Sequence, residues 1–298
     1  IPGVYAGGDV AGDGPSSIVK AAAEGKAVAA AIHVTLGGGE REEADAELPR
    51  VDLHEMVKRR ARREYRVPIE HTPLSERDGF DDTVVGYSAS QAMSEAERCL
   101  DCHTICSLCV GVCPNMALMT YESEPFTAAL PMLRVDGGQV VAEGHEAYRA
   151  EQLLQIAVLT DFCNECGNCV TACPTSGEPY RDKPRLYLDR AEFEAEADNA
   201  YMLHADGSVE GRYRGQTHRL SVNGSVEYET PGLRARLDPT SLALLEADAT
   251  AGLEAPSLRP AADMLVLARG LRGSMPQLPL VTAAESSGTR ITHPGYEE

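Results

Sequence analysis

The chain has 298 residues, 43% of them hydrophobic, which is enough for two or three domains with apolar cores. Its formal net charge of -19 argues against nucleic acid binding, because that requires clustered Lys and Arg side chains on one face. The sequence contains no run of 18 apolar residues and no signal peptide, so no membrane insertion is expected.

The first 33 residues are typical of a strand, a glycine turn and a helix. Residues 4–6 precede Gly7-Gly8-Asp9, and Ser16 or Ser17 can cap a helix that continues to Ile32. We therefore expect the last βα piece of a doubly wound domain over residues 1–33. Because the chain begins inside this motif with Ile1 rather than Met, we also expect an upstream part of the protein.

Residues 34–87 are predicted to form a linker with a basic helix. Three glycines at 37–39 and an acidic run lead to a helix expected at about 51–65, then to a polar loop. A charge run on such a helix is usually a solvated face, and the alternative is a docking surface for an acidic partner or a phosphate. The six cations of this basic run are Lys58, Arg59, Arg60, Arg62, Arg63 and Arg66.

A further helix, expected at about 88–100, leads into nine cysteines that lie within 75 residues. The second run, at 163–174, has the spacing C-x2-C-x2-C-x3-C-P of a bacterial ferredoxin motif for a 4Fe-4S cluster. The first run has C-x3-C-x2-C-x3-C-P, preceded by one more cysteine. We therefore expect a ferredoxin-like domain with two 4Fe-4S clusters over residues 88–190. The candidate ligands are Cys99, Cys102, Cys106, Cys109, Cys113, Cys163, Cys166, Cys169 and Cys173.

Two ligand schemes are compatible with these spacings. In two-cluster ferredoxins the fourth cysteine of each motif serves the other cluster. Cys113 would then join the first three cysteines of the second run, while Cys173 would join Cys106, Cys109 and either Cys102 or Cys99. In the local scheme each run holds its own cluster, and Cys106 is spare. His103 stands where the regular motif has a cysteine, and it is a less favoured ligand than a thiolate.

Structural zinc is the alternative to the clusters. Zinc ribbons also use C-x2-C pairs, but three cysteines at successive x2 spacings would crowd a single tetrahedral ion. Cysteines confined to one stretch of a large acidic chain are typical of an intracellular metal site, so a cytoplasmic location is expected. We find no nucleophile or acid-base pair for a substrate and assign no catalytic residue.

Residues 191–280 are predicted to form an antiparallel β meander with helices. Segments of alternating polarity between 200 and 229 are joined by Asp206-Gly207, Gly215-Gln216 and Asn223-Gly224, which are hairpin signals. They predict four strands, and helices are expected near 239–247 and 260–272. An earlier hairpin is expected at Asp136-Gly137-Gly138, and residues 281–298 are expected to form a flexible tail. The predicted fold class is therefore α+β with several domains.

Two stretches resemble known redox proteins. Residues 1–10 (IPGVYAGGDV), 14–19 (GPSSIV) and 23–26 (AEGK) resemble the C-terminal flavin motif of the pyridine nucleotide-disulfide oxidoreductase superfamily. Residues 74–77, Phe80 and 95–102 (EAERCLDC) look like the cysteine-rich start of glutamate synthase small subunits and dihydropyrimidine dehydrogenases. Together with 163–169 (CNECGNC), they are most similar to the iron-sulfur flavoprotein subunit assigned to selenate reductases, of which this chain would be a C-terminal fragment. The resemblance covers about residues 1–32 and 70–190.

This resemblance implies FAD, with NADPH or NADH as the electron donor and a redox partner protein such as a molybdenum enzyme subunit. It assigns the flavin contacts to Gly8, Asp9, Pro15, Ser16 and Ser17, the last three at a helix start, where the backbone favours anionic groups. The rest of the flavin site and the nicotinamide site are expected upstream of Ile1.

The sequence thus predicts an iron-sulfur flavoprotein oxidoreductase in which two 4Fe-4S clusters carry electrons from a flavin reduced by NAD(P)H to a partner oxidoreductase. One alternative is a non-catalytic assembly module whose clusters are structural staples and whose C-terminal sheet docks a partner. Another is a self-contained ferredoxin reductase, which would require an upstream nicotinamide domain.

Overall fold

The computed structural model describes residues 3–8, 10–11, 18–39, 52–100, 105–136, 139–250, 253, 256–276 and 278. The chain divides into two compact units, one formed by Ala44–Cys106 and the other by Ile1–Glu43 with Ser107–Glu298. Three predicted features lie outside the described residues: the acidic part of the linker, the glycines of the hairpin after Asp136, and the tail at 281–298. No helix in the described ranges is both long enough and apolar enough to cross a membrane.

The N-terminal segment consists of a glycine turn and helix α1 (Ile18–Thr35), which contains the helix predicted up to Ile32 and is rich in alanine, the best helix former. The Gly8 N–H donates to the Glu24 carboxylate at 2.7 Å, which ties the turn to the helix. The strand expected at residues 4–6 is not formed. A strand requires a hydrogen-bonded neighbour, and these residues pair with none in the described part of the chain.

The described residues of the unit Ala44–Cys106 contain two short α-helices, α2 (Leu53–Ala61) and α3 (Ala89–Glu97), and a 3-10 helix at Leu74–Glu76. Asp52 caps α2 by accepting a hydrogen bond from the Glu55 N–H at 3.0 Å. Ser88 and Gln91 form a capping box at the start of α3. Both helices lie within the ranges predicted for them, 51–65 and 88–100, and both are shorter.

The basic run of α2 is partly used inside this unit. Arg59 donates to the Glu97 carbonyl and Arg60 to the Ile105 carbonyl, each at 2.5 Å. Lys58 forms an exposed ion pair with Glu55 at 2.6 Å, so it follows the ordinary pattern of a solvated helix face.

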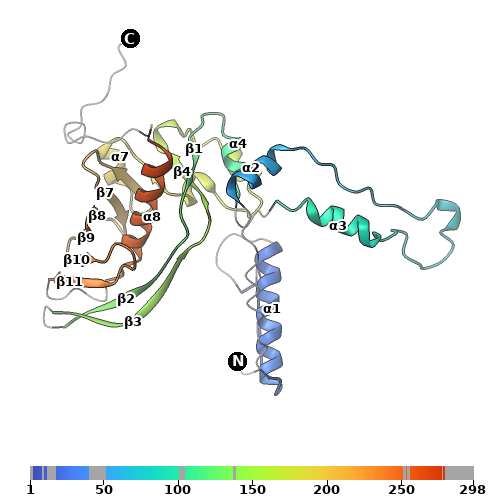
Figure 1. Ribbon diagram of the computed structural model, residues 1–298, viewed down its shortest axis with the longest axis horizontal. Helices are drawn as coiled ribbons and strands as arrows, with labels where there is room; N and C mark the ends of the chain where they lie inside the picture. The colour runs from blue at the N-terminus through green and yellow to red at the C-terminus, as the bar shows by residue number, and fades with distance from the viewer. Residues whose placement is uncertain are drawn as a thin grey trace, which may run out of the picture. The chain divides into compact units, whose positions relative to one another are not determined.

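The larger unit is built on a nine-stranded sheet with the order β1-β4-β5-β6-β7-β8-β9-β10-β11 (Figure 1). β1 and β4 are antiparallel, β4, β5 and β6 are parallel, and the strands from β6 to β11 pair antiparallel as a meander. The strands are β1 (Leu118–Glu122), β4 (Leu154–Leu159), β5 (Arg185–Leu186), β6 (Ala200–Leu203), β7 (Val209–Tyr213), β8 (Gln216–Asn223), β9 (Ser225–Thr230), β10 (Leu233–Leu237) and β11 (Leu244–Ala249).

Short helices connect the parallel strands. The chain from β4 to β5 passes through α5 (Asn168–Ala172) and α6 (Pro179–Asp182), and the chain from β5 to β6 passes through α7 (Arg190–Ala195). Parallel neighbours need such crossovers because a tight hairpin cannot join them. The cysteines of the second run therefore lie in a crossover that leaves the end of β4.

Between β1 and β4 the chain forms a separate two-stranded arm, β2 (Phe126–Asp136) and β3 (Gln139–Ala150). Asp136 pairs with Gln139, so the strands on both sides of the predicted hairpin are present. In Figure 1 the arm curves past the lower end of α8 toward β11, and β3 contacts both elements. It contacts helix α8 through the Tyr148 hydroxyl, which donates to the Asp263 carboxylate at 2.9 Å.

Helix α8 (Arg259–Ser274) confirms the helix predicted near 260–272. It lies at the centre of the main core. Its apolar side chains pack with residues of β1, β3 and the meander in one apolar cluster. The helix approaches β1 closely at Gly270, where a Cβ atom would lie 2.5 Å from the Tyr121 ring. Glycine is the residue that permits this contact, because it has no side chain to displace Tyr121.

The C-terminal half departs from the sequence prediction in two elements, the unpredicted strand β10 and the strand β11. The hairpins at Asp206-Gly207, Gly215-Gln216 and Asn223-Gly224 are confirmed by the pairing of β6 to β9. The helix expected at 239–247 is wrong, since these residues form a turn and most of strand β11, which pairs with β10. The meander therefore has six strands rather than four, and its sheet continues into the cysteine-bearing segment without a break.

Candidate metal centre

Two segments far apart in sequence meet at the start of the sheet. Cys113 follows the short helix α4 (Leu108–Gly111) and precedes β1, while Cys163 follows β4. Because β1 and β4 pair with Leu118 opposite Val158, the two cysteine runs are brought to the same end of this strand pair. Helices α4 and α5 also contact each other.

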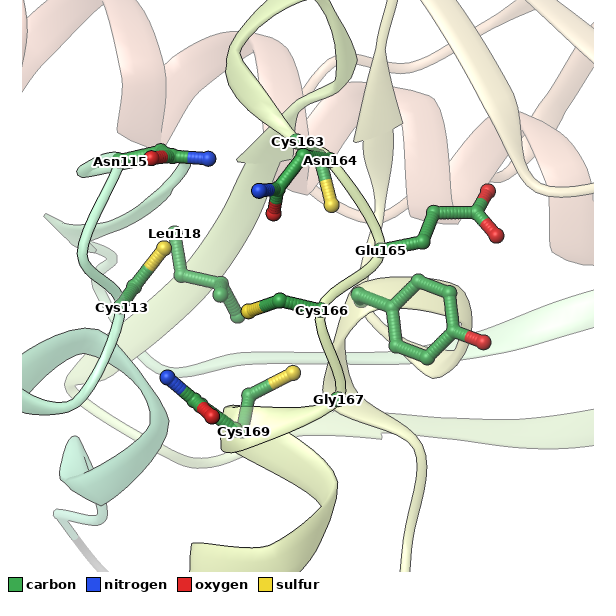
Figure 2. Close-up of a pocket in the computed structure, with 11 residues that line it drawn as sticks. Cys113, Asn115, Leu118, Cys163, Asn164, Glu165, Cys166, Gly167 and Cys169 are labelled. Atoms are coloured by element: carbon green, nitrogen blue, oxygen red, sulfur yellow. The ribbon is translucent and has the colours of Figure 1, made fainter.

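The sulfur atoms of Cys113, Cys163, Cys166 and Cys169 face one cavity (Figure 2). In that view Cys113 lies on one side and the three cysteines of the second run lie opposite. The empty volume of the cavity is about 280 Å³. The remaining lining residues are Asn115, Leu118, Asn164, Glu165, Gly167, Asn168 and Tyr180.

The loop that carries the second run needs two residues in the left-handed region of the backbone. Glu165 has φ 53° and Gly167 has φ 79°, so the chain turns on either side of Cys166. Gly167 adopts this conformation without steric cost and begins α5, which carries Cys169. A non-glycine residue such as Glu165 is uncommon there, and such backbone is typical of sites where the surroundings hold a loop in place.

An apolar cluster supports the cavity from behind. It contains buried Cys109 and Cys169 together with Leu118, Ile156 and Val158 of the paired strands β1 and β4. The alternation of side chains along a strand places one set of residues on this face. The two strands therefore provide both the spacing of the cysteine runs and a dry wall beneath them.

The remaining cysteines of the two runs have other surroundings. Cys173 lies 3.3 Å from the Thr175 hydroxyl and does not line this cavity. Cys99 and Cys106 belong to the unit Ala44–Cys106, where Cys99 is exposed and Cys106 is half-buried. Cys102 and His103 lie outside the described residues. The structure thus brings Cys113 together with the second run, and the ligands of a second cluster stay a prediction.

Backbone groups already favour the thiolate form at Cys113. Burial opposes its ionisation, but hydrogen bonds from the backbone at Leu118, Ala117, Asn115 and Met116 outweigh burial and lower the Cys113 pKa. The pKa of Cys169 is raised, chiefly by burial, and the backbone at Tyr180 opposes this only in part. Thiolates are the form that binds metal, so hydrogen bonds of this kind both prepare a ligand and adjust a bound cluster.

The donor set is four thiols, which are the usual ligands of a 4Fe-4S cubane, one at each iron. A tetrahedral zinc site also needs four donor atoms, about 2.3 Å from one point. In this structure no three His, Cys, Asp or Glu side chains of the described ranges are close enough together to hold a metal ion.

Sequence reasoning did not identify the other residues of the cavity wall. Leu118 comes from β1 and Tyr180 from α6, seven residues after Cys173. Neither belongs to the cysteine spacing, and an apolar residue in a strand is usually a core residue. Only the pairing of β1 with β4 and the path of the crossover place them here.

The residues assigned to a flavin are mostly outside the described ranges. Asp9, Pro15, Ser16 and Ser17 are among those outside, and Gly8 is described. The Gly8 N–H, which would face an anionic group, donates instead to Glu24. The flavin contacts expected at these residues therefore stay a prediction.

Comparison with known proteins gives a partial match. The chain is 28% identical over 134 residues to proteins described as "Putative oxidoreductase YgfK" from Escherichia coli K12 and from Escherichia coli O157:H7. The match covers 45% of this chain and 11% of each relative, so the chain spans only a small part of the length of these proteins. No protein family model matches the chain, and no solved structure matches it.

Proposed function

We propose that this chain is the electron-transfer part of an oxidoreductase and passes electrons through two 4Fe-4S clusters to a partner protein. The observation that carries the proposal is the cavity lined by Cys113 from the first run and by Cys163, Cys166 and Cys169 from the second. This is the combination expected when two ferredoxin motifs exchange their fourth ligands. The relatives described as oxidoreductases support the same class of activity.

In this proposal those four cysteines hold one cluster, and Cys106, Cys109 and Cys173 hold the other with Cys102 or Cys99. A bound cubane supplies reversible one-electron transfer, with a potential set by its hydrogen bonds and its burial. The chain contributes the backbone donors at Cys113, the apolar wall of Leu118, Ile156 and Val158, and the exclusion of water on that side.

The electron donor and acceptor are proposed on the resemblance alone. We propose a flavin reduced by NADPH or NADH as the donor, contacted in this chain by Gly8, Asp9, Pro15, Ser16 and Ser17. We propose a partner oxidoreductase, such as a molybdenum enzyme subunit, as the acceptor.

Iron and sulfide analysis with EPR on anaerobically prepared protein tests the proposal. We expect about eight iron and eight sulfide per chain, and clusters that dithionite reduces. Protein that contains only zinc would refute the proposal. Clusters that are present but resist physiological reductants would favour structural staples in place of electron transfer.

Double substitution distinguishes the two ligand schemes. Cys113→Ala and Cys166→Ala should each reduce the iron content to about four, and the combination should cost no more than either alone, because both residues hold the same cluster. The matched control combines Cys166→Ala with Cys109→Ala, one substitution per proposed cluster, and should remove nearly all iron. If the Cys113 and Cys166 pair behaves like this control, each run holds its own cluster.

A further inference from the structure

A second, larger cavity lies directly beside the cysteine cavity. Its empty volume is about 1120 Å³, and it shares Cys163, Glu165 and Tyr180 with the cysteine site. Figure 2 shows the Glu165 carboxylate pointing away from the four sulfur atoms. A molecule in this cleft would be separated from the cysteine site by single side chains.

The lining of the cleft is polar and acidic. Six of its eleven residues are charged, four as carboxylates and two as guanidinium groups. Small-molecule sites are lined mainly by apolar and aromatic side chains, so this composition is unusual for one. The charged residues are Asp161, Glu165, Arg181, Arg185, Glu192 and Glu196.

One pair of these charges is neutralised within the protein. Arg185 and Glu196 form two parallel hydrogen bonds at 2.9 and 2.8 Å, and the Tyr187 hydroxyl donates to the same carboxylate at 2.6 Å. This bidentate pair is partly buried and gives the cleft a rigid wall. It adds no net charge to the cleft.

The remaining charges leave an excess of carboxylates at the opening. Arg181 is exposed and lies 3.9 Å from Glu165, and it is also paired with Glu178 at 3.3 Å. Asp161 and Glu192 are exposed and have no cationic partner among the ion pairs of the described chain. Phe162, between Asp161 and Cys163 in the sequence, is 53% exposed, although its side chain does not line the cleft.

We propose that this cleft is the docking site of the electron-transfer partner, and that the partner is a protein that inserts Lys or Arg side chains from a basic surface. The inference rests on the proposed electron transfer, and it adds where the electron leaves and what charge its acceptor carries. Weak redox encounters bury little area and depend on complementary charge for their association rate. The exposed carboxylates next to Cys163 provide the complementary charge, and exposed Phe162 offers a small apolar contact.

Stopped-flow reduction of cytochrome c tests this proposal. Dithionite-reduced protein, freed of excess reductant, is mixed at low ionic strength with ferric cytochrome c, whose surface is basic, or with cytochrome c whose lysines have been succinylated. Each ferric haem accepts one electron and becomes ferrous. We expect the basic form to react about tenfold faster or more, and the difference to shrink as salt screens the charges.

Two matched double variants locate the effect. Asp161→Asn with Glu192→Gln removes two charges at the cleft, and Glu227→Gln with Asp248→Asn removes two exposed charges of the meander, on β9 and β11. The cleft variant should reduce the preference for basic cytochrome c severalfold, and the meander variant should leave it within about twofold. Equal effects of the two variants would overturn the proposal. An effect of the cleft variant on hexaammineruthenium(III) but not on cytochrome c would also overturn it, in favour of a small cationic ligand.

Iron content and dithionite reduction of every variant are measured first. If the unaltered protein contains no clusters that dithionite reduces, the proposed function itself is refuted. Reducible clusters whose electron transfer ignores the acceptor's charge refute only the docking site.

Discussion

Substitution of Gly270 by alanine tests the packing that holds α8 against β1. The added Cβ atom would lie 2.5 and 2.7 Å from two carbons of the Tyr121 ring and 2.9 Å from the Glu122 carbonyl oxygen. Carbon atoms in contact are normally 3.5–4.0 Å apart, so the helix or the strand must move by roughly 1 Å. Overpacking of this kind costs about 1–3 kcal/mol.

Gly273 of the same helix is the matched control, because an added Cβ there meets nothing within 4 Å. Both substitutions gain up to about 1 kcal/mol from the higher helix propensity of alanine, so the difference between them isolates the clash. Urea unfolding followed by circular dichroism should show Gly273→Ala at or above the stability of the unaltered protein and Gly270→Ala about 1–3 kcal/mol below Gly273→Ala. Equal stability of the two variants would refute the described approach of α8 to β1.

Three further substitutions test polar groups of the larger unit. The contacts of its carboxylate with His204 at 3.3 Å and with Arg190 at 2.6 Å lower the Glu210 pKa to about 2. The Glu210 carboxylate therefore stabilises the fold above its ordinary pKa of 4.5, and this contribution is lost as the pH falls toward 2. Glu210→Gln should cost about 1–3 kcal/mol at pH 7 in urea titrations and much less at pH 2. Tyr148→Phe removes the donor to half-buried Asp263 and should cost about 1–3 kcal/mol in the same measurement, whereas no loss would mean that this hydrogen bond is not formed. Burial lowers the His218 pKa from 6.5 to about 4, so the unfolded chain takes up a proton first and stability should fall between pH 6.5 and 4. His218→Asn should make the melting temperature depend less on pH over that range, and an unchanged pH profile would contradict this assignment.

Local signals predicted much of the C-terminal half, and one of them was misleading. Asp-Gly and Asn-Gly pairs predicted hairpins because few other sequences adopt the required turns. The sequence prediction places a helix at 239–247, and Asp238, just before this segment, is a residue type that also caps helices. In the structure the Asp238 carboxylate accepts hydrogen bonds from Thr240 and Ser241, but these close a turn between β10 and β11. The same side-chain hydrogen bonds serve both conformations. This segment pairs with β10 as strand β11, and Arg236 of β10 forms an ion pair with Glu246 of β11 at 2.8 Å.

The candidate site could be predicted only in part for a related reason. Cysteine spacing describes one loop at a time, so it indicated the three neighbouring sulfur atoms of the second run. Whether Cys113 joins them depends on how β1 and β4 pair across the arm that separates them. Spacing therefore left two ligand schemes open, and the cavity favours the scheme in which Cys113 is exchanged.

The register in which β1 pairs with β4 also determines whether the four cysteines can meet. Leu118 opposes Val158, with Cys113 five residues before this pair and Cys163 five residues after it. Slipping the pair by one residue would turn Met119 toward the cavity in place of Leu118, because side chains alternate between the faces of a strand. Slipping it by two residues would restore the face but displace one cysteine run by roughly 6.8 Å along the other. Only one register of β1 and β4 therefore brings the four sulfur atoms together. The geometry of the site depends on a strand pairing in which no cysteine takes part.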